Sequence, residues 1–173
     1  MVLEKMKTLE ITQDSLISQL DSTSSQLSEV KGRLNESMTS IFANSSTFRG
    51  SEYFLSQPMA NNVAMFDGLC RLYGGRLVEP RDQQELFFVA SLQKDALPLN
   101  NVMLGFTDAG HEGNWTLLSS GARTNYTKWA ASEPSGGVPQ SCVFLNDADT
   151  LMYDDVCQDT TPMRFVCVVP LWT

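Results

Sequence analysis

The segment between residues 133 and 157 concentrates side chains that could hold a metal ion. It reads EPSGGVPQSCVFLNDADTLMYDDVC, with two cysteines, several acidic residues and a glycine–proline turn. Ca²⁺ takes about six to eight hard oxygen ligands, which carboxylates, side-chain amides and backbone carbonyls can supply. The same composition also fits a solvated acidic loop that a disulfide closes. The residue types therefore leave two interpretations open, and the elements that would position the loop have to be considered.

The overall charge of the chain excludes some classes of partner. Its 173 residues carry a net charge of −8, and no run of lysine or arginine occurs. Nucleic acids and anionic membranes both require a basic surface, so neither is expected as a partner. No apolar stretch approaches the roughly twenty residues of a membrane span. The first residues, MVLEKMKTLE, lack the apolar core of a secretion signal, so we expect any such signal to lie outside this chain.

Cysteine usage and glycosylation triplets point to an extracellular protein. The cysteines are Cys70, Cys142, Cys157 and Cys167. Their number is even and none form a CxxC pair, which favours two disulfides over a zinc site. Four reduced thiols in a cytosolic protein are the alternative. The Asn-x-Ser/Thr triplets begin at Asn35, Asn44, Asn114 and Asn125. Together these features predict a secreted glycoprotein.

Residues 2–41 carry a heptad repeat of mostly apolar residues. One series is Val2, Leu9, Leu16, Thr23, Val30 and Ser37, and the other is Met6, Gln13, Leu20, Leu27, Leu34 and Ile41. The series alternate at spacings of three and four residues, the pattern of a coiled-coil seam. An amphipathic helix packed on its own domain is the alternative, but about 60 Å of helix is too long for that. We expect residues 1–44 to form a parallel oligomeric neck and residues 45–50 to be a hinge.

The remainder, residues 51–170, has the pattern of an α+β domain. SEYFLS reads as a strand, and apolar residues from Met59 to Tyr73 follow helical spacing. Asp82 followed by Glu85 predicts the start of a second helix within EPRDQQELFFVASLQKDALP. Short strands then follow at VMLGF, NWTLL, CVFL and RFVCVV. Two helices, small antiparallel sheets and a long loop region define the predicted fold.

Taken together, these motifs resemble the C-type lectin-like domain. They are LCRLYGGRLVEPRD, MLGFTDAGHEGNW, YTKWAASEPSGG, SCVFL, YDDVC and RFVCVV. The resemblance implies disulfides Cys70–Cys167 and Cys142–Cys157, and a long loop that holds calcium, which in turn coordinates two vicinal hydroxyls of a sugar. A helical neck before such a domain is similar to the collectins, whose necks trimerise. It implies a secreted homotrimer that binds glycans or glycoproteins, with a role in innate immunity.

The resemblance also implies which residues hold the ion. Glu-Pro-Ser at 133–135 occupies the place of the family's Glu-Pro-Asn triplet, and Gln140 occupies that of a second glutamate. Counting back from Cys157 makes Asp154 the last ligand, whereas alignment by the Tyr-Asp-Asp pattern adds Asp155. The implied metal ligands are Glu133, Ser135, Gln140, Asp154 and Asp155, and the carbohydrate contacts are Glu133, Ser135, Gln140 and Asp154.

The implied site lacks several of the family's ligands. Serine in the triplet loses the amide donor of asparagine, and Tyr153 stands where the family has asparagine. An auxiliary site would retain Asp108 and Glu112, but Gly136 and Ser141 replace its other two acids. The alternative function is therefore a lectin-fold protein-interaction or matrix module that has lost calcium and sugar binding. Enzyme activity is not expected, because no nucleophile–base pair stands out.

Overall fold

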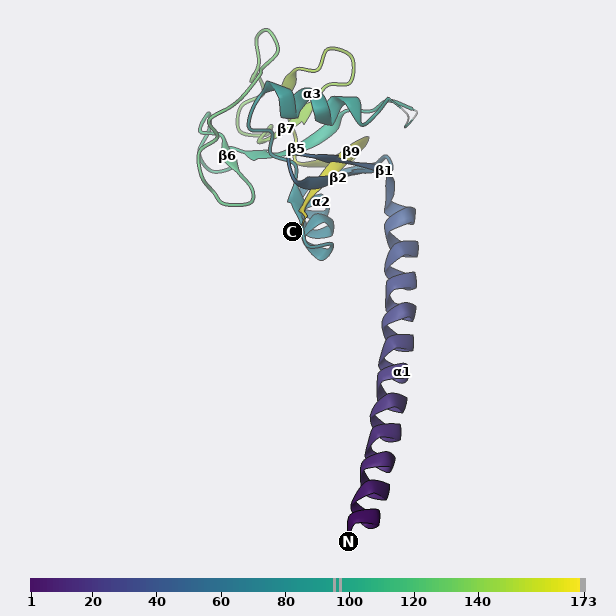
Figure 1. Ribbon diagram of the computed structural model, residues 1–173. Helices are drawn as coiled ribbons and strands as arrows, with labels where there is room; N and C mark the ends of the chain where they lie inside the picture. The colour runs from purple at the N-terminus through teal and green to yellow at the C-terminus, as the bar shows by residue number, and fades with distance from the viewer. Residues whose placement is uncertain (95, 97, 172–173) are drawn as a thin grey trace. The chain divides into compact units, whose positions relative to one another are not determined.

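The computed structural model describes residues 1–94, 96 and 98–171. The chain divides into two compact units, Met1–Ser40 and Ile41–Thr173, which we call the stalk and the head. Two residues of the predicted second helix, 95 and 97, lie outside the described part of the chain. Figure 1 labels the elements of both units.

The stalk is formed by helix α1 (Val2–Ile41), which runs for 40 residues (Figure 1). Its apolar seam residues are exposed in the single chain, and Leu9 and Leu20 are each 69% exposed. Large apolar side chains repeated along one face leave water only when another surface covers them. The long helix is confirmed, whereas its association into a coiled coil remains a prediction. No helix among the described residues is long and apolar enough to cross a membrane.

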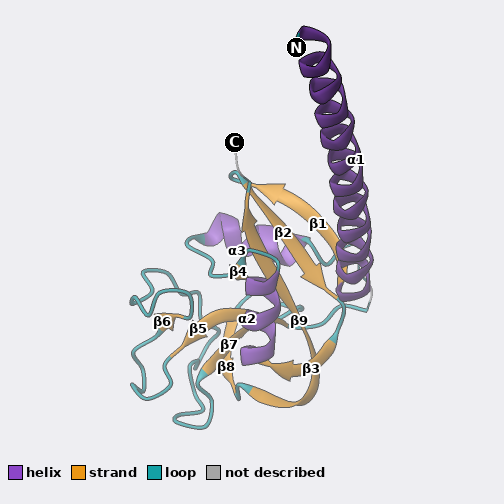
Figure 2. Cartoon of the chain, turned by 90° about the horizontal axis from the view of Figure 1, so that it is seen from below, coloured by secondary structure: helices purple, strands orange, loops and turns teal. Residues whose placement is uncertain are grey.

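A mixed β-sheet forms the centre of the head. Its strands are β1 (Phe42–Phe48), β2 (Ser51–Ser56), β3 (Met59–Asn62), β4 (Arg76–Leu77), β5 (Val102–Thr107), β6 (Thr116–Leu117), β7 (Cys142–Leu145), β8 (Met152–Asp155) and β9 (Gln158–Pro170). The main order is β1-β2-β9-β5-β7-β8, with β3 and β4 pairing with β9 and β6 pairing with β5. Figure 2 shows β9 running through the middle of the head.

One strand pairing corrects the prediction of small antiparallel sheets. Strand β9 is 13 residues long and pairs antiparallel with β2, β3 and β4. It also pairs in parallel with β5 through Val102 and Arg164. A strand of this length has room for partners on both edges, so it joins the antiparallel pairs into one mixed sheet. The α+β class is confirmed, with the sheet more continuous than its short strand motifs suggested.

Helix α2 (Val63–Leu72) starts later than its apolar pattern predicted. The side chain of Asn62 caps it by accepting a hydrogen bond from the backbone N–H of Met65 at 2.9 Å. The preceding residues instead form β3, in which Met59 pairs with Met163 of β9. Periodicity alone could not place this boundary, because apolar residues at the end of a strand continue the helical spacing.

Helix α3 (Gln83–Ser91) begins where the capping pattern predicted. The carboxylate of Asp82 accepts a hydrogen bond from the backbone N–H of Glu85 at 2.9 Å. Glu85 is fully buried and accepts hydrogen bonds from the hydroxyl of Tyr53 and the backbone N–H of Arg81. Leu86 on the same helix packs into the main core of the head. The helix ends at Ser91, well before the predicted limit.

The predicted hinge at residues 45–50 lies largely in strand β1, which pairs antiparallel with β2. Phe42, at the start of β1, contacts three aromatic rings at centroid distances between 5.5 and 6.0 Å. Those rings belong to Phe54, Tyr73 and Phe165. Phe48, at the other end, stacks on Phe88 at 4.5 Å. Strand β1 is therefore part of the head. A buried ring at one end and a half-buried ring at the other pack against the head, although the residues between them are polar.

Two disulfides join the pairs that the resemblance implied. The bond Cys70–Cys167 connects α2 to β9 and spans 97 residues of sequence. The bond Cys142–Cys157 connects the start of β7 to the turn after β8 and spans 15 residues. No free cysteine occurs in the described part of the chain. Cross-links of this kind restrict the unfolded chain and so stabilise the head.

Candidate functional site

The loop that follows Lys128 is fixed against β8 by backbone hydrogen bonds. The N–H of Met152 donates to the carbonyl of Lys128 at 2.8 Å, and the N–H of Ala130 donates to the carbonyl of Met152 at 3.0 Å. Trp129 thereby forms an isolated parallel bridge with Met152. This short pairing holds the Glu-Pro-Ser tripeptide at 133–135 beside the strand that carries Asp154.

Asp154 is the residue around which the loop closes. Its Oδ1 accepts a hydrogen bond from the backbone N–H of Ser135 at 3.0 Å, and its Oδ2 accepts one from Gly136 N–H at 2.8 Å. The peptide bond between Glu133 and Pro134 is cis. The hydroxyl of Ser135 donates to Oε1 of Glu133 at 3.4 Å, so the side chains that flank the proline lie on the same side. The tripeptide therefore turns its oxygen atoms toward the carboxylate of Asp154.

The electrostatics of this loop are those of two carboxyl groups held next to each other. A hydrogen bond to Asp154 raises the pKa of Glu133 above its ordinary value, and burial adds to that effect. Burial alone would raise the pKa of Asp154, but hydrogen bonds from the Glu133 carboxyl and from the loop N–H groups lower it. Glu133 Oε2 is enclosed, and no N–H or hydroxyl group of the described residues donates to it. A cation between the two groups would offset the repulsion between them and favour the ionised form of Glu133.

Gln140 also reaches the loop. Its side-chain amide lies over Gly136, in the space that a Cβ atom on residue 136 would occupy. Its backbone N–H donates to the carbonyl of Gly137 at 2.8 Å, which closes a tight turn. A glycine at 136 is therefore needed for this approach. The structure thus brings Glu133, Ser135, Gln140 and Asp154 together, as the sequence predicted for four of its five metal ligands.

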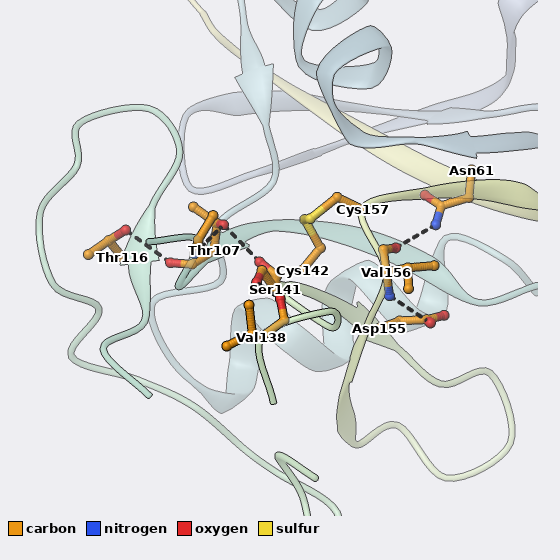
Figure 3. Close-up of a disulfide and its surroundings, with 10 residues drawn as sticks. Asn61, Thr107, Thr116, Val138, Ser141, Cys142, Asp155, Val156 and Cys157 are labelled. Carbon is orange, nitrogen blue, oxygen red and sulfur yellow. Dashed lines mark hydrogen bonds between the residues drawn. A yellow bond between two sulfur atoms is a disulfide. The ribbon is translucent and has the colours of Figure 1, made fainter. Parts of the chain in front are cut away.

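The fifth predicted ligand, Asp155, lies on the other face of β8. Successive residues of a strand point to opposite faces, and Asp154 is buried while Asp155 is only partly so. The carboxylate of Asp155 instead accepts a hydrogen bond from Val156 N–H at 2.7 Å (Figure 3). Tyr153 shares that other face, stacks on Phe144 at 5.4 Å and donates to Asp149 at 2.7 Å. The structure favours counting back from Cys157 over alignment by the Tyr-Asp-Asp pattern.

The disulfide Cys142–Cys157 holds the base of this region together. Figure 3 shows it between two hydrogen-bonded groups of residues from distant parts of the chain. On one side, the hydroxyl of Thr107 donates to the carbonyl of Ser141 at 2.7 Å. On the other, the amide of Asn61 donates to the carbonyl of Val156 at 2.8 Å. Strands β7 and β8 are therefore fixed at the end that leads into the loop.

The auxiliary site inferred from the earlier loop is only partly assembled. Asp108 is buried, and its Oδ2 accepts a hydrogen bond from Gly113 N–H at 2.8 Å. Glu112 is exposed. Ser141 uses its hydroxyl to donate to the carbonyl of Val138 at 2.9 Å. Asp108 therefore closes its own loop.

The residues near Asp154 fit a calcium ion of low affinity. Two carboxylates, a serine hydroxyl and a glutamine amide oxygen are hard ligands of the type that Ca²⁺ prefers. No cluster of three or more His, Cys, Asp or Glu side chains suited to a metal occurs in residues 1–94, 96 and 98–171. Because calcium affinity follows the number of charged ligands, two carboxylates predict a weak site. Transition metals that require histidine or cysteine ligands are not suited to it.

Comparison with known proteins identifies the family. The model of the Lectin C-type domain matches residues 60–169. The chain belongs to the C-type lectin domain family. It is 32% identical over 100 residues to C-type lectin domain family 3 member A of Mus musculus, covering 57% of this chain and 50% of that protein. It is 28% identical over 142 residues to C-type lectin domain family 11 member A of Rattus norvegicus, covering 70% of this chain and 42% of that protein.

This C-type lectin domain chain spans about half the length of the curated relatives it matches. Among solved structures, the mouse scavenger receptor C-type lectin carbohydrate-recognition domain superposes with a TM-score of 0.65 at 19% identity, covering 76% of this chain and 97% of that one. Human lithostathine gives 0.65 at 26%, covering 74% and 98%. A calcium-independent type II antifreeze protein gives 0.62 at 16%, covering 74% and 92%. The same fold therefore also occurs in a protein that is described as calcium-independent. The matched family and the curated relatives are those of C-type lectins rather than enzymes.

Sequence reasoning missed the parts of the site that are made by the backbone. The N–H groups of Ser135 and Gly136 donate to Asp154. The direction of a backbone N–H group cannot be inferred from the type of the residue that carries it. It also missed that Asn44 uses its side-chain Nδ2 to donate to the carbonyl of Leu92 at 2.9 Å. The Asn-x-Ser/Thr triplet could not reveal this contact, because the partner lies 48 residues away.

Proposed function

We propose that the head binds carbohydrate through a weak calcium site formed by Glu133, Ser135, Gln140 and Asp154. The observation that supports it best is the meeting of two carboxyl groups across the loop, with an enclosed oxygen of Glu133 that no N–H or hydroxyl group of the described residues reaches. That arrangement is electrostatically unfavourable without a cation and favourable with one. Calcium would leave coordination positions open to water and to two vicinal hydroxyls of a sugar.

Calcium titration of the full chain, monitored by thermal shift and calorimetry, tests this proposal. We expect a saturable increase in melting temperature that a chelator reverses, since a ligand that binds only the folded state stabilises it. Glu133→Gln should remove the shift because it takes away one of two carboxylates. Glu36→Gln, which removes an exposed acid from α1 outside the head, is the matched control and should leave the shift unchanged. No shift at millimolar calcium, or equal shifts in both variants, would overturn the proposal.

Carbohydrate binding needs its own experiment once calcium binding is measured. Retention of the chain on immobilised monosaccharides and glycoproteins should require calcium and should be lost in Glu133→Gln. Retention that survives chelator would contradict a calcium bridge. Loss of the amide donor at Ser135 changes the tripeptide by which the family's mannose and galactose types are distinguished, so both sugars belong in the screen.

We further propose that α1 assembles the chain into a parallel homotrimer. The exposed seam of α1 carries apolar residues at heptad spacing, and the collectin-like arrangement implies three strands. Several heads on one stalk would convert weak contacts with single sugars into useful avidity for a surface. A low-affinity calcium site and an oligomeric stalk are thus parts of one function.

Secretion and N-glycosylation complete the proposal. Two disulfides and exposed acceptor asparagines suit an oxidising, extracellular compartment. Asn35, Asn114 and Asn125 are exposed and suited to carry glycan. Asn44 is half-buried, and its amide nitrogen is already engaged with Leu92. Mass spectrometry of the secreted protein should find glycan at the three exposed sites, and occupancy at Asn44 would contradict the assignment.

A protein-interaction module without calcium is the second candidate function. The observation that favours it is the orientation of Tyr153, which stands at a ligand place of the family yet stacks on Phe144 and bonds to Asp149. Both Asp154 oxygens are also satisfied by backbone N–H groups without a metal. Absence of any calcium-induced shift, with an intact disulfide-linked head, would select this alternative.

A further inference from the structure

The acidic and basic residues of the head are segregated along the sequence. Residues 131–163 contain six acidic residues and no lysine, arginine or histidine. Three arginines of the remaining head are paired with acids around α3 and the segment before it. These ion pairs are Arg49–Asp82 at 2.6 Å, Arg76–Glu79 at 3.4 Å and Arg81–Glu85 at 3.1 Å. The surroundings of α3 thus lack the surplus of negative charge that residues 131–163 carry.

Arg123 is the exposed arginine of the described head that forms no ion pair. It lies beside β6, with which it forms a bridge through Thr116, and its side chain is exposed. It forms no ion pair with any acid of the described residues, unlike the three arginines around α3. The acid that lines the same cavity, Glu79, is already bound by Ser119, whose N–H and hydroxyl both donate to it at 2.7 Å. An uncommitted guanidinium therefore faces surroundings whose acids are neutralised.

Two small cavities flank the segment that carries Arg123. One, of about 310 Å³, is lined by Arg123 together with Arg81, Asn125 and Tyr126. The other, of about 210 Å³, is lined by Arg123 together with Trp115, Thr127 and Trp129. The loops around β6 that contain these residues extend from the sheet on the side away from β1 (Figures 1 and 2).

Each cavity is lined by a residue whose enclosed polar side-chain atom lacks a partner in the described part of the chain. Tyr126 OH in the first and Trp115 Nε1 in the second are enclosed and have no hydrogen-bond partner in the described part of the chain. Both can donate, as can the five N–H groups of the Arg123 guanidinium. An unpartnered enclosed donor costs free energy, which a ligand oxygen that reached it would recover. The half-buried ring of Trp129 offers an apolar face beside the charge.

We propose that Arg123 and the two flanking cavities bind the acidic groups of an anionic polysaccharide, independently of calcium. A guanidinium engages carboxylate or sulfate through two parallel hydrogen bonds, which distinguishes Arg123 from a diffuse basic patch. An aromatic ring beside it supplies a surface for the apolar face of a sugar ring. The cavities adjoin one another through Arg123 and Thr124, which suits successive units of a chain better than one compact anion. This binding does not rest on the calcium site proposed above.

The experiment measures binding of the full chain to immobilised polysaccharides in buffer that contains a chelator. The chain is first freed of N-linked glycan, because Asn125 lines one of the two cavities. Dextran sulfate presents sulfate alone, hyaluronan presents carboxylate alone, and neutral dextran presents neither. We expect binding to at least one acidic polymer, none to dextran, and weaker binding as salt is raised. Arg123→Gln should weaken binding about tenfold, because it removes a bidentate charge-assisted contact.

A matched variant and a conservative variant make the result decisive. Arg71→Gln removes the same charge from an exposed side chain on α2 and should change binding less than about twofold. Arg123→Lys keeps the charge but loses the paired geometry, so its affinity should be intermediate. If Arg123→Gln and Arg71→Gln weakened binding equally, the effect would be one of net charge alone. That result would overturn the proposal. Absence of binding to both acidic polymers would also overturn it, whatever calcium does at Glu133.

Discussion

Replacing Phe42 with alanine tests whether β1 belongs to the head. Phe42 is 7% exposed and contacts the rings of Phe54, Tyr73 and Phe165. Truncation of a buried phenylalanine to alanine costs about 3–5 kcal/mol, part of which comes from lost ring–ring contacts. Because Phe42 opens an edge strand, where neighbours can close over the space, we expect the lower end, about 3 kcal/mol. For a head of this size that corresponds to a fall in melting temperature of roughly 10 °C.

Urea unfolding of the oxidised protein, followed by tryptophan fluorescence, measures this change. Trp115 and Trp129 lie 5.1 Å apart in the head and report on its unfolding. Phe87→Ala is the matched control, because Phe87 is 42% exposed and its ring lies under the ammonium group of Lys128. The control should lose less than about 1 kcal/mol. Similar effects of Phe42→Ala and Phe87→Ala would refute the conclusion that aromatic anchors hold β1, and would restore the predicted hinge.

Three further predictions concern the stalk, the loop disulfide and pH. Removal of residues 1–40 should give a monomeric head with an unchanged melting temperature, as sedimentation and thermal unfolding would show; a surviving oligomer would mean that heads associate directly. Replacing both Cys142 and Cys157 with alanine should lower the free energy of unfolding by about 3 kcal/mol, the entropy expected for a 15-residue loop; a loss below about 1 kcal/mol in urea would contradict this. The raised pKa of Glu133 means that it takes up a proton at a higher pH than an ordinary glutamate, so calcium affinity measured by calorimetry should fall as pH is lowered through that raised pKa. An affinity that stays constant until the pH range of ordinary carboxylates would show that Glu133 is not a ligand.

The sequence predicted those elements whose signals are local. The heptad spacing indicated the long helix now seen as α1, and the pair Asp82 and Glu85 indicated the start of α3. Both signals depend on side chains within one or two helical turns of each other, so they survive without knowledge of the rest of the chain. The disulfide pairing was implied by resemblance to the family, and the structure has the same pairs.

Elements that depend on distant partners could not be placed from the sequence. The polar run at residues 42–50 looked like a hinge, yet Phe42 reaches an aromatic cluster contributed by β2, α2 and β9. The segment 59–62 continued a helical pattern, yet β9 takes it as a strand. In both cases, pairing with a strand elsewhere in the chain outweighs the conformation that the local sequence favours. Strand pairing adds hydrogen bonds and apolar contacts that an isolated segment lacks.

The composition of the acidic loop made a weak cation site chemically reasonable, and resemblance to the family implied Glu133, Asp154 and Asp155 as its charged ligands. Only the tertiary structure decided between Asp154 and Asp155, because the two alternate across β8 and just one faces the loop. The same holds for Arg123, an unremarkable residue in the sequence. Its lack of an acidic partner follows from ion pairs that the fold forms around it. Residue types thus specified which chemistry was available, whereas strand registers and packing decided which side chains meet.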